Sequence, residues 1–139
     1  MDPQSAATLE GQELPIIHRH PTRQDLIRFA AASEDFASQH WDTYHMRGLG
    51  FPNVIVHGWL TLTYMCQAVT EWLPPERGTV LGYDARHKRP TFPGPLTCGG
   101  RVASISVEDG KTIVDVAMWA KDASGMVTTA GTMKLRLEA

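Results

Sequence analysis

The chain reads VIVHGWLTLTYMCQAVTEWL between residues 54 and 73, and apolar side chains occupy nearly every helical face of this stretch. Only Gln67 and Glu71 are strongly polar along its body, and Pro74 and Pro75 follow it. Proline ends a helix because it lacks an amide N–H and clashes with the preceding turn. The pattern therefore predicts a long helix, about residues 55–73, that is buried on most faces.

After this helix the hydrophobic pattern changes to a period of two, which is typical of strands. Strands are predicted over residues 79–89, 97–107, 111–121 and 126–137. The turn sequences EDG before the third of these strands and DASG after it indicate hairpins. We therefore expect an antiparallel meander of four strands.

A buried helix followed by one antiparallel sheet favours an α+β fold. In the hot-dog arrangement a curved sheet wraps around a central helix, and only such a sheet covers so many helical faces. We expect residues 1–139 to form this single domain. One sheet of this size leaves apolar surface and strand edges exposed, so we expect a homodimer, with a heterodimer of paralogues as the alternative.

The region before the long helix is less regular. Thr22 is placed as the N-cap of a predicted helix over residues 23–32. Residues 34–52 have no sustained period, and we expect an irregular segment there with one helical turn near residues 42–46. The polar residues 1–13 are predicted to form a loose N-terminal segment.

Composition narrows the class of partner. The chain has 13 basic and 15 acidic residues and a formal charge of -2, which gives no general attraction to nucleic acid or to an anionic membrane. The two cysteines, Cys66 and Cys98, have no metal-binding or disulfide-framework spacing, so a cytoplasmic protein is expected. We find no signal peptide pattern and no apolar run long enough to span a membrane.

Three residues suggest acid/base chemistry next to a carbonyl group. Asp35 and His40 lie five residues apart, and Gly58 follows at the start of the long helix. A carboxylate holds a proton-transfer partner in place, and histidine is the residue type that changes charge nearest neutral pH. A backbone N–H at the start of a helix can stabilise a developing oxyanion.

These residues resemble the motifs of a known family, the MaoC-like dehydratases and (R)-specific enoyl-CoA hydratases, which have the hot-dog fold. The hydratase motif is matched by Phe29, Ser33, Asp35 and His40. The family's Ile-Val-His-Gly segment before the central helix is present over residues 55–58, and its Pro-x-x-x-Gly step resembles residues 90–95. The resemblance covers about residues 22–137.

The resemblance implies a hydro-lyase of fatty acid or lipid metabolism that hydrates trans-2-enoyl thioesters or dehydrates 3-hydroxyacyl thioesters. By this resemblance Asp35 and His40 hold the water and share the proton transfers on one face, and the Gly58 N–H binds the oxyanion. No metal or redox cofactor is expected. Coenzyme A or an acyl carrier protein would be part of the substrate.

Six further residues are expected to contact the substrate. His57, Trp59 and Cys66 lie at or along the predicted central helix, where Cys66 would line the acyl tunnel. Arg86, Lys88 and Arg89 form a basic run at a strand end that could bind the phosphates of coenzyme A.

The chain departs from the family pattern between the acid and the histidine. Ala37 and Ser38 replace an Asn-Pro pair, and Gln39 replaces an aliphatic residue. Pro95 stands where the family usually has an acid. Such variation occurs in MaoC-like proteins that act on bulky acyl-CoAs, including those that resemble steroid side-chain hydratases, so the acyl group stays open.

Structural explanations compete with each of these roles. Asp35 could cap the turn near residues 42–46, and His40 could lie on a surface loop. His57 could brace the loop through a backbone hydrogen bond, and Gly58 could serve only to let the helix pack closely against the sheet. There are two alternative functions: a thioesterase of the same fold, and a partner subunit that completes the site of a paralogue.

Overall fold

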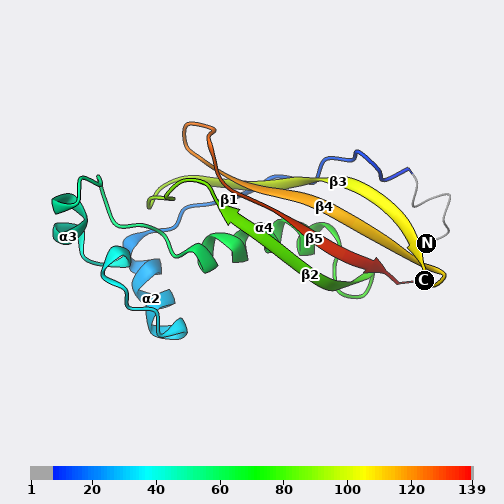
Figure 1. Cartoon of the computed structure of the whole chain (residues 1–139), viewed down its shortest axis with the longest axis horizontal. Coiled ribbons are helices and arrows are strands. Elements are labelled where there is room, and N and C mark those ends of the chain that lie inside the picture. The colour runs from blue at the N-terminus through cyan, green and yellow to red at the C-terminus, as the bar shows by residue number, and fades with distance from the viewer. Residues whose placement is uncertain (1–7, 139) are drawn as a thin grey trace.

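The computed structural model describes residues 8–138, and its centre is one antiparallel sheet packed on a long helix (Figure 1). The sheet has five strands in the order β1-β3-β4-β5-β2. Its strands are β1 (Ile17–Arg19), β2 (Gly78–His87), β3 (Leu96–Glu108), β4 (Lys111–Asp122) and β5 (Val127–Leu137). The α-helices are α2 (Arg23–Ser33), α3 (Thr43–Gly48) and α4 (Gly58–Trp72), and a 3₁₀ helix spans Ser38–His40. The predicted α+β hot-dog fold is confirmed.

The helix α4 lies against the sheet because its apolar side chains meet the inner residues of the strands. Met65 and Val69 have no exposed surface. They belong to one core cluster with residues of β3, β4 and β5, among them Val102, Val116 and Leu135. Burying a side chain of this size is worth about 1.5–3 kcal/mol, so helix and sheet stabilise each other.

A second, smaller core joins the helices at one end of the molecule to the start of α4 (Figure 1). It contains Leu26 of α2, Met46 of α3 and Leu60 of α4, together with Val54 and Val56 of the segment before α4. This core holds the loop between α2 and α3 against the first turn of α4.

The central helix begins later than predicted. α4 starts at Gly58, and its N-cap His57 has ψ 133°, which is extended rather than helical. Residues 54–56 are instead held by two neighbouring segments: Ile55 N–H donates to the Gln39 carbonyl at 2.8 Å and Val56 N–H to the Thr91 carbonyl at 2.7 Å. The prediction of a helix from residue 55 was therefore wrong by one turn.

The four predicted strands correspond to β2–β5, with ends shifted by one or two residues. The predicted meander is correct for β3, β4 and β5 but wrong for β2, which pairs with β5 at the edge of the sheet. The chain therefore crosses over between β2 and β3. The short strand β1 pairs with β3 and forms the opposite edge.

The N-terminal elements are partly as predicted. Thr22 caps α2 in a reciprocal capping box with Asp25, and Asp42 caps α3. Residues 11–14 are not loose, because Gly11, Gln12 and Leu14 exchange backbone hydrogen bonds with β3. Residues 1–7 of the predicted loose segment lie outside the described residues.

The two cysteines are free thiols. Burial raises the pKa of Cys98 to about 12 and raises that of Cys66 as well, so neither favours the reactive thiolate. Over residues 8–138, no helix is long and apolar enough to span a membrane.

Truncation of the α4 core is expected to destabilise the fold. Met65→Ala removes a fully buried side chain and leaves a cavity between α4 and the sheet, so we expect a loss of about 2–5 kcal/mol in the free energy of unfolding. Urea denaturation measures this loss. Thr63→Ala, at an exposed position of the same helix, is expected to change it by less than about 0.5 kcal/mol. Equal effects of the two substitutions would contradict the proposed core.

Candidate active site

The segment between α2 and α3 carries the predicted acid and histidine. α2 ends at Ser33, and its C-cap Glu34 has φ 61°, a left-handed conformation that turns the chain away from the helix axis. Asp35 follows, and its carboxylate accepts a hydrogen bond from Ala37 N–H at 3.3 Å. The 3₁₀ helix then places the His40 ring next to Ile55, in the segment before α4. Asp35 therefore does not cap α3, because Asp42 has that role.

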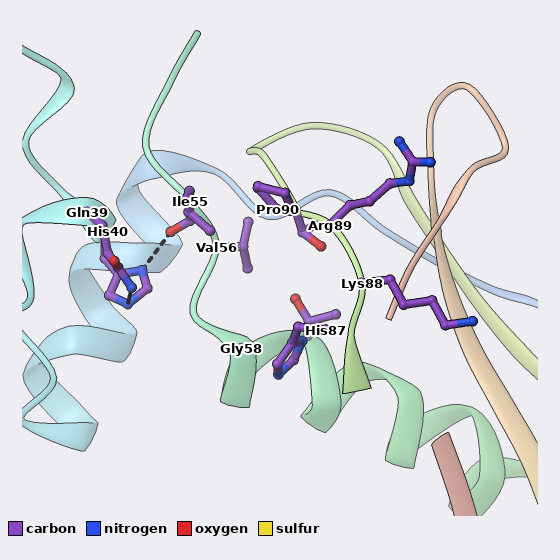
Figure 2. A pocket seen from close by; sticks show the side chains of 11 residues that line it. Gln39, His40, Ile55, Val56, Gly58, His87, Lys88, Arg89 and Pro90 are labelled. Atoms are coloured by element: carbon purple, nitrogen blue, oxygen red, sulfur yellow. Dashed lines mark hydrogen bonds between the residues drawn. The ribbon is translucent and has the colours of Figure 1, made fainter. Parts of the chain in front are cut away.

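His40 is buried, with 5% of its surface exposed, so it is not a surface-loop residue. Its Nδ1 lies 2.7 Å from the Ile55 carbonyl, an acceptor, and must therefore carry the proton (Figure 2). In the neutral ring Nε2 then carries a lone pair and acts as an acceptor. This atom lies 3.6 Å from Asp35 Oδ2 and 3.3 Å from the amide nitrogen of Gln39. The backbone thus fixes His40 in the form that accepts a proton at Nε2.

His57 lies behind this pair and has no exposed surface. Its Nε2 donates to the Asp35 carbonyl at 3.1 Å, and its ring stacks on His40 with centroids 3.8 Å apart and planes at 18°. Burial lowers the pKa of His57, although the bond to the Asp35 carbonyl opposes this, so the ring is kept neutral. His57 braces both members of the Asp35–His40 pair, which matches its predicted structural role.

Asp35, His40 and His57 place possible metal-ligand atoms within 4.8 Å of one another. A metal ion lies in the ring plane of each histidine that binds it, at about 2.1 Å. The rings of His40 and His57 are stacked and nearly parallel, so no point lies in both planes at that distance. This geometry does not fit a metal site that uses both histidines.

Gly58 is the first residue of the 15-residue helix α4. The first amide N–H groups of a helix have no acceptor within it and lie at the positive end of the helix dipole. A Cβ at this position would lie 2.6 Å from His87 Nε2, so close packing also favours glycine here. The predicted oxyanion role and the predicted packing role are therefore compatible.

Two cavities meet at these residues. The first cavity, of about 320 Å³, extends along the chain that follows β2, which carries Lys88 and Arg89 (Figure 2). Thr61 and Thr91 also line it. The second cavity, of about 520 Å³, is lined by Asp35 and by the larger side chains of Trp59, Leu62 and Tyr83. Four residues line both cavities, namely Gln39, His40, Gly58 and His87. We call this set the junction.

The predicted substrate-binding residues are distributed unevenly around the junction. Trp59, 66% exposed, lines the second cavity, and Cys66 lines a third cavity of about 330 Å³ that shares Trp59, Leu62 and Tyr83 with the second. Lys88 and Arg89 line the first cavity. His57 and Arg86 line none of these three cavities.

Among the cavity-lining residues that sequence reasoning missed, His87 and Thr61 have polar side chains at the start of α4. His87 was hidden in a basic run, yet it lies opposite Thr129 in the β2–β5 register and its ring reaches Gly58. Thr61 lies on α4 three residues after Gly58, and its buried hydroxyl has no hydrogen-bond partner among residues 8–138. The helical spacing of Gly58 and Thr61 was the one signal that pointed to Thr61.

Comparison with known proteins agrees with this fold. The family model described as MaoC like domain matches residues 5–130. Among solved structures, the (R)-hydratase from A. caviae involved in PHA biosynthesis is 25% identical, with a TM-score of 0.82 over 93% of this chain and 96% of that one.

Two further structures show the same fold. R-hydratase PhaJ1 from Pseudomonas aeruginosa is 24% identical, with a TM-score of 0.81 over 92% of this chain and 81% of that one. A chain of the ChsH1-ChsH2 complex from Mycobacterium tuberculosis is 21% identical, with a TM-score of 0.80 over 94% of this chain and 99% of that one. The search of curated proteins gave no significant match.

Neutral His57 is expected to make stability depend on pH. Because burial lowers the pKa of His57 below its ordinary 6.5, the unfolded chain binds this proton more readily than the folded one. Its contribution is therefore complete above pH 6.5 and is lost as the pH falls below that value. One such proton gives a slope of at most about 1.4 kcal/mol per pH unit.

Urea denaturation between pH 7.5 and 5 measures this slope. His57→Phe keeps a stacked ring but does not titrate, so its slope is expected to be smaller than that of the wild type. His45→Phe, at an exposed position of α3, is expected to keep the wild-type slope. A wild-type slope in His57→Phe would show that His57 does not hold a lowered pKa.

Proposed function

This chain belongs to the MaoC like domain family, and from this premise we propose that it catalyses the reversible, (R)-specific syn hydration of trans-2-enoyl thioesters. The observation that carries the proposal is the arrangement of the junction. Nε2 of His40 and the Asp35 carboxylate lie 3.6 Å apart at the place where two cavities meet at the start of α4.

The proposed reaction uses this arrangement in sequence. A water held between Asp35 and His40 gives a proton to the pair while its oxygen forms a bond to C3 of the substrate. The C2–C3 double-bond electrons move toward the thioester, and the Gly58 N–H stabilises the charge on the carbonyl oxygen. The pair then returns a proton to C2 on the same face. Dehydration follows the reverse path.

Gln39 supplies an amide near the place where the family has one. The chain has Ala37 in place of the family's asparagine, but the Gln39 side chain reaches His40 Nε2 at 3.3 Å. We propose that this amide orients His40 or the bound water. No metal or redox cofactor takes part in the proposed reaction, because side chains carry the protons and the water reacts directly with C3.

We propose an acyl-CoA as the substrate, with its two ends in different cavities. The first cavity carries the cations of Lys88 and Arg89, whose backbone N–H groups are both fixed to the Thr128 carbonyl of β5. Its buried Thr61 hydroxyl lacks a partner among the described residues and is available to a polar group of the coenzyme arm. The second cavity, with Trp59, Leu62 and Tyr83, suits the acyl group.

We also propose that the active form is a homodimer in the cytoplasm. β2 is an edge strand, and its neighbourhood exposes the large apolar side chains of Val80, Leu81, Tyr83 and Trp59. An unpaired edge with exposed apolar residues favours association. A similar chain was solved in a ChsH1-ChsH2 complex, so pairing with a different subunit is the alternative. Lack of hydratase activity in the purified chain alone would favour this alternative.

Removal of either proton-transfer group is expected to abolish hydration. Asp35→Asn and His40→Ala are each expected to lower kcat/KM for crotonyl-CoA by about 100-fold or more, because a positioned acid or base contributes about 100- to 10,000-fold. The loss of enoyl-thioester absorbance measures the rate. Unchanged rates in both variants would exclude the assigned roles, and release of free coenzyme A by the wild type would identify a thioesterase instead.

Neutralising the first cavity is expected to weaken substrate binding. Lys88→Ala and Arg89→Ala are each expected to raise KM about two- to fivefold with little change in kcat, because exposed charge pairs are worth about 0.2–1 kcal/mol. The effect is expected to shrink with added salt. Arg101→Ala, an exposed arginine of β3 that lines neither cavity, is the matched control. A KM that responds equally to all three substitutions would remove the coenzyme from this cavity.

A further inference from the structure

His87 is the last residue of β2 and is the third histidine at the centre of the site. Its ring lies over the first turn of α4 beside Gly58, and it lines both cavities (Figure 2). Nδ1 is 2.9 Å from the hydroxyl of Thr129. Nε2 is the ring atom nearest to Gly58, 2.6 Å from where a Cβ of residue 58 would lie.

The Thr129 hydroxyl sets the form of this ring. Thr129 is fully buried, and its hydroxyl has no other hydrogen-bond partner among the described residues. If Nδ1 carried the proton, Nδ1–H would donate to the Thr129 hydroxyl oxygen. The hydroxyl hydrogen of Thr129 would then be buried without an acceptor, which costs free energy. The hydroxyl therefore donates to Nδ1. The proton of the neutral ring is then on Nε2, next to Gly58.

The result is two N–H donors from neighbouring residues of the junction, because the His87 ring packs against Gly58. One is the N–H of Gly58 at the positive end of α4, which has no backbone acceptor among residues 8–138, and the other is the Nε2–H of His87 on β2. His40 lines the same junction but has the opposite character, because its Nε2 is an acceptor. The junction thus has a proton acceptor and, separately, two donors next to each other.

We propose that His87 is a further catalytic residue that donates from Nε2 to the thioester oxygen, together with the Gly58 N–H. This inference rests on the proposed function and deepens it. During hydration the electrons of the double bond move onto the thioester oxygen, and two fixed donors hold that charge better than one. Thr129 is a positioning residue, since it acts only through the His87 ring.

The size of the effect follows from the loss of one donor. Removing a donor from an enclosed oxyanion site lowers kcat about 100- to 1,000-fold. Because His87 is exposed in the isolated chain, a water molecule can donate to the thioester oxygen in a variant that lacks the His87 N–H. We therefore expect kcat to decrease by about 10- to 100-fold.

Three variants separate hydrogen bonding from space filling. His87→Phe keeps a ring but has no donor, His87→Gln keeps an N–H donor of similar reach, and Thr129→Val keeps the shape of threonine without its hydroxyl. We expect His87→Phe to lower kcat for crotonyl-CoA with little change in KM, and His87→Gln to recover most of the loss. Thr129→Val is expected to cause a smaller decrease. His45→Phe is the control, and thermal denaturation checks that each variant folds.

Equal activity of His87→Phe and the wild type would overturn the inference. So would equal impairment of His87→Phe and His87→Gln, because that result indicates a packing role alone.

A binding measurement keeps this inference distinct from the proposed function. Butyryl-CoA has the thioester but cannot be hydrated, and long-range ¹H–¹⁵N spectra of the histidine rings report its binding, with His87→Phe assigning the His87 signals. We expect a protonated Nε2 in the free protein and a shift of this signal on binding.

Bound butyryl-CoA without a change at His87 Nε2 would overturn the donor role even if hydration is observed. A shift at His87 without hydration of any enoyl-CoA would support the donor role and remove the hydratase function. Absence of both binding and hydration would overturn both.

Discussion

The burial of α4 against the sheet is the constraint on which the rest of the molecule depends. Its inner side chains, among them Met65 and Val69, have no exposed surface, so the helix cannot shift along the strands without opening the core. This fixes the position of its first residue, Gly58, next to the end of β2. Packing thereby brings the positive end of the α4 dipole next to β2, the strand that leads to Lys88 and Arg89.

The extended segment before α4 converts this packing into a site. Ile55 accepts a hydrogen bond from His40 and donates one to Gln39, while Val56 donates to Thr91 after β2. One short piece of chain therefore aligns the histidine, the helix start and the wall of the first cavity. The same bond to Ile55 determines which nitrogen of His40 is free, so the backbone selects its chemistry.

The sequence predicted the parts of the molecule that have a local pattern. Helical and alternating apolar residues located α4 and β2–β5, and the spacing of Asp35, His40 and Gly58 located three residues that the fold brings together. The edge position of β2 and the place of His87 could not be predicted, because both depend on pairing with the distant strand β5. The start of α4 was misplaced because residues 54–56 are all apolar, which fits a helix, whereas backbone hydrogen bonds to the distant residues Gln39 and Thr91 hold this segment extended.

The most direct test is the stereochemistry of hydration in D₂O. If Asp35 and His40 act from one face, crotonyl-CoA gives (R)-3-hydroxybutyryl-CoA with deuterium added at C2 on the same face as the hydroxyl. Proton coupling constants in the NMR spectrum of the product give the relative configuration of C2 and C3, and chiral chromatography of the released hydroxy acid gives the configuration at C3. A product with the (S) configuration, or with deuterium on the opposite face, would contradict the proposed site.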